Sequence, residues 1–384
     1  MQRPSFTEQF QTFISENHLC RKHEPVLLAV SGGIDSVVLT ELFRASNYNF
    51  GIAHCNFQLR GTESDTEEDF VQELAQQLQV PFYVKRFDTT AYQKKNKLSP
   101  EEAARNLRYT WFEEIRAAFG FQSIATAHHL NDSIETIILN ITKGTGIKGL
   151  MGIPVKNSRV IRPLLFASRK EIESFAEENN LLFKTDSSNL TDDYQRNMIR
   201  HHIIPKLKEI NPALENTFKK NIQNFNDAEL IYREHITNKL TKLIETRKDA
   251  IYISINRLKN LPASATYMFE IVKQFGFNAE QSSQIHDHLY GSGKQFLSDT
   301  HNLIIDRKFL IITPLKPEQT KHIVIEKENK TISAADFKLK FSLSNLTRPL
   351  KMNHSDSIIY ADAANIEYPL TLRVWKRGDY LYPL

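Results

Sequence analysis

Short apolar runs alternate with amphipathic segments along the first half of the chain. The apolar runs predict five strands: Val26–Val30, Phe50–His54, Phe82–Phe87, Ser123–Ala127 and Val160–Leu165. Between these runs the apolar residues follow helical spacing, as in the segment 131–142, where isoleucines recur three and four residues apart. Strands that alternate with helices predict a parallel sheet with right-handed crossovers, so we expect an α/β fold.

Helix start signals support this order of elements. One helix is predicted over Thr62–Leu78. Ser99 precedes a proline and stands three residues before Glu102, which is the pattern of a capping box, and Ser168 and Glu171 repeat that spacing. Ligands of open parallel sheets bind beyond the carboxyl ends of the strands. The residues that follow each strand are therefore the candidates for a functional site.

The pattern changes after about residue 212. Residues 215–243 are predicted to be helical and carry several lysines, namely Lys219, Lys220, Lys239 and Lys242. Strand-like segments then mix with helix, and short β-like runs follow at 322–326, 337–343 and 370–375. We expect an α/β domain over residues 1–212, a mainly helical domain over 213–314 and a small α/β or β-rich domain over 315–384. The prediction allows this last domain to be incomplete.

Composition and charge exclude several classes of protein. Hydrophobic residues make up 41% and charged residues 24%, which is typical of a globular domain. No apolar run is long enough to cross a bilayer and the first residues lack a secretory pattern, so we expect a cytoplasmic protein without a membrane partner. The net charge of +4 permits a polyanionic partner without requiring one. Cys20 and Cys55 form no CxxC pair, which argues against a zinc ribbon, an iron–sulfur site or a redox dithiol.

The most informative segment follows the first predicted strand and has the sequence SGGIDS at residues 31–36. Its two glycines permit close backbone approach, and successive N–H groups before a helix form an anion cradle. No lysine follows, as it would in a Gly-Lys-Ser/Thr loop, so the segment favours gripping a pyrophosphate over γ-phosphoryl transfer. A glycine turn with Asp35 as an ordinary helix cap is the weaker alternative, because the whole strand–loop–helix context is present.

Two polar clusters lie near other strand ends. His54 ends the second strand, where it could lie beside an adenine, and Arg60 could meet a phosphate. For His54 alone, a hydrogen-bonded structural histidine is the better explanation. Arg105 and Arg108 share one helix face. They could clamp phosphates, or pair with nearby glutamates on a solvated face.

A third cluster follows the fourth strand. Asp132 and Glu135 stand three residues apart, turned away from the isoleucines. A carboxylate near a triphosphate commonly holds magnesium, and a second one can receive an ammonium group. His128 could stabilise developing charge or move protons. Two histidines and an aspartate can also bind zinc, although adjacent histidines rarely point at one ion. The glycine-rich segment 144–152 is either a flexible surface loop or a loop that closes over substrate.

The SGGxDS string is similar to the signature of the ATP-pyrophosphatase (PP-loop) family, which has an adenine nucleotide alpha hydrolase-like fold. This resemblance implies ATP binding and cleavage between the α and β phosphates. The same motifs, followed in order by Arg162–Leu165, Thr185–Asn189 and Arg196–Arg200, resemble the tRNA(Ile)-lysidine synthase family. The likeness runs from about Val26 to Arg200, and the run WKRGDYLYPL at 375–384 adds a local likeness near the end.

The second resemblance implies a two-step reaction on tRNA(Ile) with a CAU anticodon. The carbonyl oxygen at C2 of the wobble cytidine attacks the α-phosphate of ATP, and free L-lysine then displaces AMP. ATP and Mg²⁺ are the implied cofactors. The sequence is compatible with a homodimer but does not fix the oligomeric state.

The resemblance also implies roles for residues by motif position. Those implied to bind ATP are Ser31, Gly32, Gly33, Ile34, Asp35, Ser36 and His54. Those implied to assist catalysis are Asp35, Arg108, His128 and Asp132. Those implied to bind substrate are Glu135, which would contact lysine, and Arg105, Arg196 and Arg200. The Mg²⁺ ligands implied are Asp35 and Asp132.

Two positions depart from the family pattern. Phe57 stands where the family often has a second histidine, and Asn131 stands where it often has an aspartate before Asp132. The alternatives are another PP-loop tRNA-modifying enzyme such as a thiolase, an amidotransferase-type synthetase, or a non-catalytic nucleotide-gated RNA-binding protein. Thiolases commonly use paired cysteines, which are missing here, and a binding protein would not need His128, Asp132 and Glu135 together.

Overall fold

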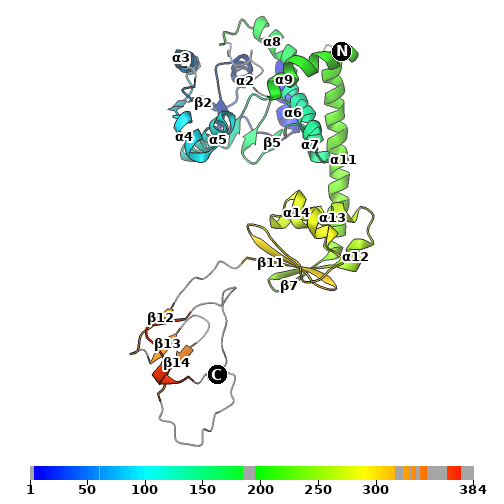
Figure 1. Cartoon of the computed structure of the whole chain (residues 1–384). Helices are drawn as coiled ribbons and strands as arrows, with labels where there is room; N and C mark the ends of the chain where they lie inside the picture. Colours follow the sequence, from blue (N-terminus) through cyan, green and yellow to red (C-terminus); the bar gives the residue numbers. More distant parts are fainter. Residues whose placement is uncertain are drawn as a thin grey trace, which may run out of the picture. The chain divides into compact units, whose positions relative to one another are not determined.

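A computed structural model describes residues 4–59, 61–184, 195–315, 323–328, 330–333, 338–343 and 361–372. The chain forms two compact units, residues 1–235 and 236–384 (Figure 1). This division does not test the three domains expected from the sequence, whose boundaries stay a prediction. None of the helices in the described parts of the chain has the length and apolar character that crossing a bilayer requires.

A six-stranded sheet forms the centre of the first unit, in the order β3-β2-β1-β4-β6-β5. Its strands are β1 (Val26–Ala29), β2 (Phe50–Asn56), β3 (Phe82–Arg86), β4 (Ser123–Ala125), β5 (Lys156–Asn157) and β6 (Val160–Ile161). All pairs are parallel except that of β5 with β6. The five expected strands are confirmed. The last is shorter than expected because Pro163, which has no N–H, cannot continue the ladder.

The strand order reverses beside β1. The chain passes from β1 to β2 and β3, and then places β4 on the other side of β1, so that Val26 pairs with both Phe50 and Ser123. Such a reversal leaves a crevice at the carboxyl ends of the two central strands. The phosphate loop follows β1 and the His128 segment follows β4. The fold therefore brings these two motifs to the same edge of the sheet.

Helices cover both faces of this sheet. The helices of this part of the chain are α1 (Phe6–Glu16), α2 (Ile34–Ala45), α3 (Thr62–Gln77), α4 (Thr89–Asn96), α5 (Pro100–Ala118), α6 (Leu130–Lys143), α7 (Ile147–Leu150), α8 (Arg169–Glu178), α9 (Gln195–Met198), the π-helix η2 (Ile199–Ile203), α10 (Ile204–Ile210) and α11 (Leu214–Leu243), the last of which continues into the second unit. The expected capping boxes of α5 and α8 are both present, which confirms these helix starts.

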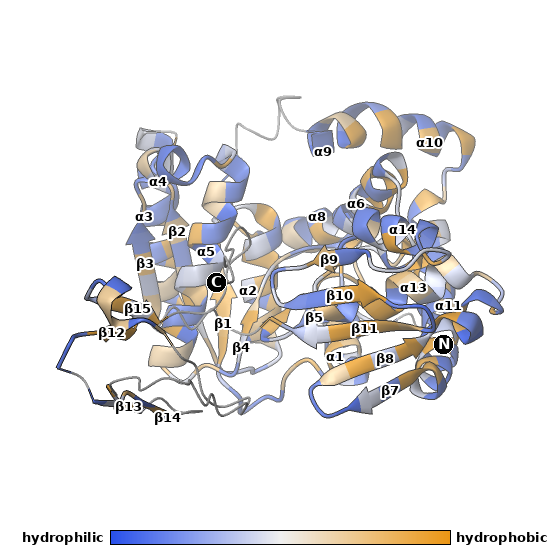
Figure 2. Ribbon diagram, turned by 60° about the horizontal axis from the view of Figure 1, so that its bottom comes forward, coloured by the Kyte–Doolittle hydropathy of each residue, from blue (hydrophilic) through white to orange (hydrophobic). Residues whose placement is uncertain are grey.

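Side-chain alternation along β1 divides the core into two layers. Val26 and Leu28 pack with Phe10 of α1 and with residues of α2 and α8, whereas Leu27 packs with Trp111 of α5. Successive residues of a strand point to opposite faces, so a strand covered on both faces is apolar throughout. Figure 2 shows this for β1 and β4, which are coloured as hydrophobic along their length.

The second unit contains an antiparallel five-stranded sheet in the order β7-β8-β11-β10-β9. Its elements are β7 (Ile244–Arg247), β8 (Ala250–Ser254), α12 (Ile255–Lys259), α13 (Ser264–Val272), η3 (Lys273–Phe275), α14 (Ala279–Asp287), β9 (Gln295–Leu297), β10 (His301–Ile305) and β11 (Phe309–Pro314). The helices lie on one side of the sheet (Figure 1). The region expected to be mainly helical thus holds its helices, and the strand-like segments expected among them form one sheet.

Short strands follow, as the sequence indicated for this region. β12 (Ile323–Ile325) pairs with β15 (Leu370–Leu372), and β13 (Thr331–Ser333) pairs with β14 (Lys338–Lys340). A 3-10 turn, η4, covers Ala363–Asn365. The run at 375–384 and the segment 185–189, both part of the family likeness, lie outside the described residues.

Close packing of β2 gives a first test. A Cβ added at Gly51 would lie 2.8 Å from Cζ of Phe121 and 3.3 Å from the carbonyl oxygen of Pro81. We expect Gly51→Ala to lower the free energy of unfolding by about 1–3 kcal/mol through overpacking. Gly146→Ala is the control, because nothing lies within 4 Å of a Cβ added there. Urea denaturation measures both, and an unchanged stability of Gly51→Ala would contradict this packing.

Candidate active site

The phosphate loop joins β1 to α2 at the carboxyl edge of the sheet. The Ser36 hydroxyl accepts hydrogen bonds from the N–H groups of Ser31 and Gly32, both at 3.2 Å, and donates to the carbonyl of Gly33 at 2.8 Å. Gly32 has a φ of +93°, a conformation that favours glycine. Ser31 is exposed, and the N-cap residue Gly33 offers no side chain to cap α2. The N–H of Ser36 donates to the Gly33 carbonyl at 3.0 Å, so the first-turn N–H groups that can meet an anion are those of Ile34 and Asp35.

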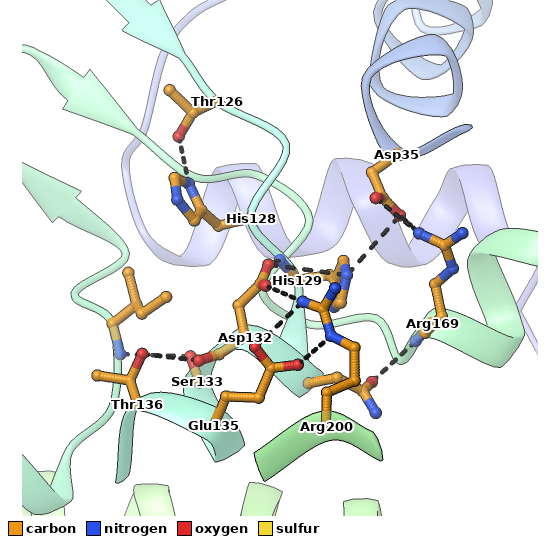
Figure 3. A network of polar contacts seen from close by, with 12 residues as sticks. Asp35, Thr126, His128, His129, Asp132, Ser133, Glu135, Thr136, Arg169 and Arg200 are labelled. Carbon is orange, nitrogen blue, oxygen red and sulfur yellow. Dashed lines mark hydrogen bonds and ion pairs between the residues drawn. The ribbon is translucent and has the colours of Figure 1, made fainter. Parts of the chain in front are cut away.

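Asp35, in the first turn of α2, is held by an arginine that sequence reasoning missed. Nη1 of Arg169 lies 2.9 Å and 2.8 Å from the two carboxylate oxygens of Asp35 (Figure 3). Arg169 begins α8, and its Nε donates to Glu173 at 2.7 Å. Its backbone N–H donates to the Asn131 side chain at 2.9 Å. The carboxylate of Asp35 is thus fixed by a residue that α6 and α8 together position.

His129 lies between two carboxylates. Its Nε2 is 3.8 Å from Oδ1 of Asp35 and 3.7 Å from Oδ2 of Asp132. Its backbone N–H also donates to Asp132 at 3.0 Å. The ring is 5% exposed, and its Nδ1 has no partner among the described residues. Asp35 and Asp132, from two different helices, therefore meet around one imidazole.

Arg200 joins the two acidic residues of α6. Its Nε donates to Glu135 at 2.7 Å and its Nη2 lies 3.5 Å from Asp132 (Figure 3). Burial raises the pKa of Glu135, which is 1% exposed, and Arg200 offsets part of that rise. Burial alone would also raise the pKa of Asp132, but the neighbouring histidines, the His129 N–H and Arg200 bring it below its usual value. The two carboxyl groups thus differ in their readiness to accept a proton.

A π-helical turn places Arg200. The segment Ile199–Ile203 is π-helical, and the N–H of Ile204 donates to the carbonyl of Ile199, five residues back. Pro205 follows directly and lacks the N–H that an α-helix would use there. Turns of this kind are frequent at functional sites. The proline therefore gives a local reason for the geometry that turns Arg200 toward α6.

His128 lies on the other side of this network, beside Thr126 (Figure 3). The Thr126 hydroxyl is 2.9 Å from Nδ1 of His128. Burial lowers the pKa of His128 to about 4; Asp132 opposes this, and three cations add to it: Arg108, Arg162 and Arg196. The imidazole is therefore neutral near pH 7. It can accept a hydrogen bond or a proton there, but it brings no positive charge of its own.

The other expected residues occupy different places. Arg105 is exposed with its guanidinium 4.9 Å from the ring centre of Tyr109, Arg108 lies 5.2 Å from that of Phe57, and Arg196 donates to Thr136 at 2.8 Å. His54 is 2% exposed, with Nδ1 2.8 Å from the carbonyl oxygen of Val30. Its predicted contact with ATP stays a prediction. Arg60 lies outside the described residues.

The donor atoms around His129 fit magnesium. Carboxylate oxygens are hard ligands, and Mg²⁺ usually takes one or two carboxylates together with water and phosphate oxygens. Asp35 and Asp132 supply such a pair beside the open turn of α2. No group of three or more histidine, cysteine or acidic side chains in the described residues is arranged to hold a metal ion. The arrangement suits a metal that arrives with a phosphate ligand.

Comparison with known proteins decides among the families that use such a loop. A PP-loop domain profile matches residues 2–207, and a TilS substrate binding domain profile matches residues 246–315. The tRNA(Ile)-lysidine synthase of Parabacteroides distasonis is 39% identical over 376 residues, which cover 97% of this chain and 84% of that protein. The chain belongs to the tRNA(Ile)-lysidine synthase family. The protein of the same name from Bacteroides thetaiotaomicron is 35% identical, with the same two coverages.

The two departures from the family pattern have structural explanations. Asn131 accepts from the backbone N–H of Arg169 and donates from Nδ2 to Glu215 of α11 at 3.4 Å. An aspartate could not make the second bond, because it has no donor when ionised. Phe57 stacks on Phe87, with ring centres 5.7 Å apart. In this member of the family, Asn131 links three helices and Phe57 is a packing residue.

The burial of His128 leads to a prediction on proton binding. Its pKa of about 4 lies below the ordinary 6.5, so the native state binds fewer protons than the unfolded state between these pH values. The stability that depends on neutral His128 is thus fully present above pH 6.5 and is lost as the pH falls toward 4. Titration of the imidazole C–H signals by NMR, assigned with His128→Gln, should give a midpoint near 4. A midpoint near 6.5 would exclude this environment.

The pair of Arg200 and Glu135 leads to a prediction on stability. We expect Arg200→Met to lower the free energy of unfolding by about 2 kcal/mol, because it leaves a buried carboxylate unpaired; the 37% exposure of the Arg200 side chain keeps the value moderate. Adding Glu135→Gln should recover most of the loss. Thermal and urea denaturation of the two variants measure this coupling. Additive losses in the double variant would show that the two side chains do not interact.

Proposed function

We propose that the chain joins L-lysine to C2 of the wobble cytidine of tRNA(Ile) with a CAU anticodon, and forms lysidine, AMP and diphosphate. The observation that carries the proposal is the similarity over 97% of the chain to proteins named tRNA(Ile)-lysidine synthase. Use of ATP follows from the PP-loop family. The roles of single residues, of magnesium and of lysine are proposed from the geometry at the carboxyl edge.

In the first step, the carbonyl oxygen at C2 of cytidine attacks the α-phosphorus of ATP, and the bond to the β-phosphate breaks. Ser31–Ser36 and the open turn of α2 would hold the departing diphosphate, since N–H donors aimed at developing charge lower the barrier. Magnesium bound to Asp35 and Asp132 would supply charge neutralisation on the phosphates. Arg108 would stabilise the same negative charge, and His128 would accept a hydrogen bond or a proton beside the reacting base.

In the second step, the ε-amine of lysine attacks C2 and the bond to AMP breaks. A lysine ammonium must lose a proton before its nitrogen can attack. Glu135 suits this task, because burial raises the pKa of its carboxyl group. Arg200 now occupies both oxygens of Glu135. We propose that lysine enters beside this pair, with Arg105, Arg196 and Arg200 near the substrates.

We propose that the transfer RNA contacts the region after the catalytic domain. The TilS substrate binding domain matches residues 246–315, which include the sheet β7–β11. Helix α11 carries four exposed lysines, which suit phosphate contacts: Lys219, Lys220, Lys239 and Lys242. The division into residues 1–212, 213–314 and 315–384 is retained as part of this proposal. A homodimer also stays a prediction.

The state of the cysteines disfavours a cysteine-dependent thiolase. Sulfur transfer by cysteine requires a thiolate. Burial raises the pKa of both Cys20 and Cys55 to about 12. Both therefore stay protonated near pH 7. A nucleotide-gated binding protein is likewise disfavoured. It would not need Asp132, Glu135 and His128 together at one edge of the sheet.

Labelled lysine tests the function directly. The chain is incubated with labelled lysine, ATP, Mg²⁺ and tRNA(Ile) with a CAU anticodon. We expect AMP release and label in the RNA from the wild type. Asp132→Asn should lower AMP formation by at least about a hundredfold while tRNA binding is kept, because it removes a charge that would act on the phosphates.

The matched control for Asp132→Asn is Asp69→Asn, an exposed residue of α3 that should leave both readouts unchanged. Sulfur in the RNA would support a thiolase, and no AMP at all would support a binding protein. Loss of tRNA binding alone in Asp132→Asn would contradict the role given to this residue.

A further inference from the structure

In the described part of the first unit, seven arginines have a carboxylate partner. These pairs are Arg21 with Glu24, Arg44 with Glu41, Arg86 with Glu68, Arg116 with Glu113, Arg169 with Asp35, Arg200 with Glu135, and Arg233 with Glu229. Their charges are thus compensated within the protein. They hold elements together or position a carboxylate, and they are not free to bind a second anion without losing the first.

Four arginines at the carboxyl edge differ from these. Among the described residues they form no ion pair. Arg105 and Arg108 lie over aromatic rings, Arg196 donates to a threonine hydroxyl, and Arg162 contacts a carbonyl and a tyrosine. No carboxylate of the described residues forms an ion pair with these four guanidinium groups, although Arg196 lies close enough to Glu135 to lower its pKa.

Arg162 is the most unusual of the four. It is 5% exposed, its Nη1 donates to the carbonyl of Pro154 at 2.6 Å, and the nearby Tyr109 side chain offsets part of the fall in its pKa that burial causes. Its Nε is buried and has no partner among the described residues. Burying a cation without a counter-charge is costly, whereas a neutral amide could bond the same carbonyl without that cost. A role in holding Pro154 therefore does not explain why the residue is charged.

The strand register places Arg162 beside the reacting edge. It follows Ile161 at the end of β6, and the N–H of Thr126 at the end of β4 donates to the Ile161 carbonyl at 3.0 Å. Thr126 in turn contacts His128. The charge of Arg162 lowers the pKa of His128, as do those of Arg108 and Arg196. Three of the four cations therefore lie near His128, and Arg105 lies close enough to Arg162 to lower its pKa.

This cluster is separate from the phosphate loop. The loop follows β1, whereas Arg162 follows β6, and β4 lies between these two strands. The loop offers backbone N–H groups, and the cluster offers guanidinium groups, which bind phosphate through paired, charge-assisted hydrogen bonds. The two features suit two different anionic groups that are held on either side of β4.

We propose that Arg162 is a further substrate-binding residue, which forms with Arg105, Arg108 and Arg196 a site for a phosphate oxyanion beside His128. The proposal rests on the proposed function, in which two substrates could supply the phosphate oxyanion. One is a phosphate of ATP, and the other is a phosphodiester of the tRNA next to the target cytidine. The buried charge of Arg162 acts strongly because little water surrounds it.

Two probes separate the sources. Binding of inorganic pyrophosphate and ATP by calorimetry tests the nucleotide, and binding of an RNA hairpin with a CAU loop by fluorescence anisotropy tests the phosphodiester. We expect Arg162→Met in the full chain to lower the affinity for at least one probe about tenfold. If that probe is the hairpin, the salt dependence of its binding should also fall by about one released counterion. The control is Arg116→Met, which removes an arginine that Glu113 already compensates.

Weaker pyrophosphate and ATP binding assigns the site to the nucleotide, and weaker hairpin binding assigns it to RNA. Unchanged binding of all probes in Arg162→Met overturns the proposal, as does equal weakening in Arg116→Met. If Arg162→Met does not fold, two other variants replace it. Arg162→Gln can still donate to Pro154 and must weaken binding, whereas Arg162→Lys keeps the charge and must retain binding. Any other result with these two variants also overturns the proposal. These binding measurements need no turnover. Failure of lysine incorporation by the wild type would therefore contradict the proposed function without deciding whether Arg162 binds an oxyanion.

Discussion

Parallel pairing of β1 with both β2 and β4 is the constraint on which the candidate site depends. It places the ends of β1 and β4 side by side, although their residues are about a hundred positions apart in the chain. The helix that follows each strand then begins at the same edge. One of these helices offers uncapped N–H groups, and the other offers Asp132 and Glu135 in its first turns. Neither segment alone combines anion binding with carboxylates.

The electrostatics of this edge fall into two parts. In one part, arginines are paired with acids: Arg169 with Asp35, and Arg200 with Glu135. Such pairs fix the orientation of carboxylates that would otherwise be costly to bury. In the other part, around His128, the cations form no ion pair within the described residues. The first part suits a metal ion and an ammonium group, and the second suits a phosphate. In the proposed reaction, lysine brings the ammonium group, and ATP and RNA bring the phosphates.

Local signals explain how much of this could be predicted. The loop at 31–36, the capping boxes and the helical spacing are short-range patterns, and each has one structural solution, so their elements and their meeting edge were predictable. Arg169 was missed because its partner Asp35 is 134 residues away, and no local pattern connects them. Arg162 was seen only as part of a motif, because burial and missing partners are properties of the folded chain. The proline at 205 was a visible signal for the π-turn before it.

The most direct test of the central claim is a crystal structure with Mg²⁺ and a non-hydrolysable ATP analogue. The account predicts β- and γ-phosphate oxygens within hydrogen-bond distance of the first-turn N–H groups of α2, and a metal ion bound by Asp35 and Asp132. The α-phosphorus should face His128. A nucleotide bound elsewhere, with the loop at 31–36 in contact with no anion, would contradict the account.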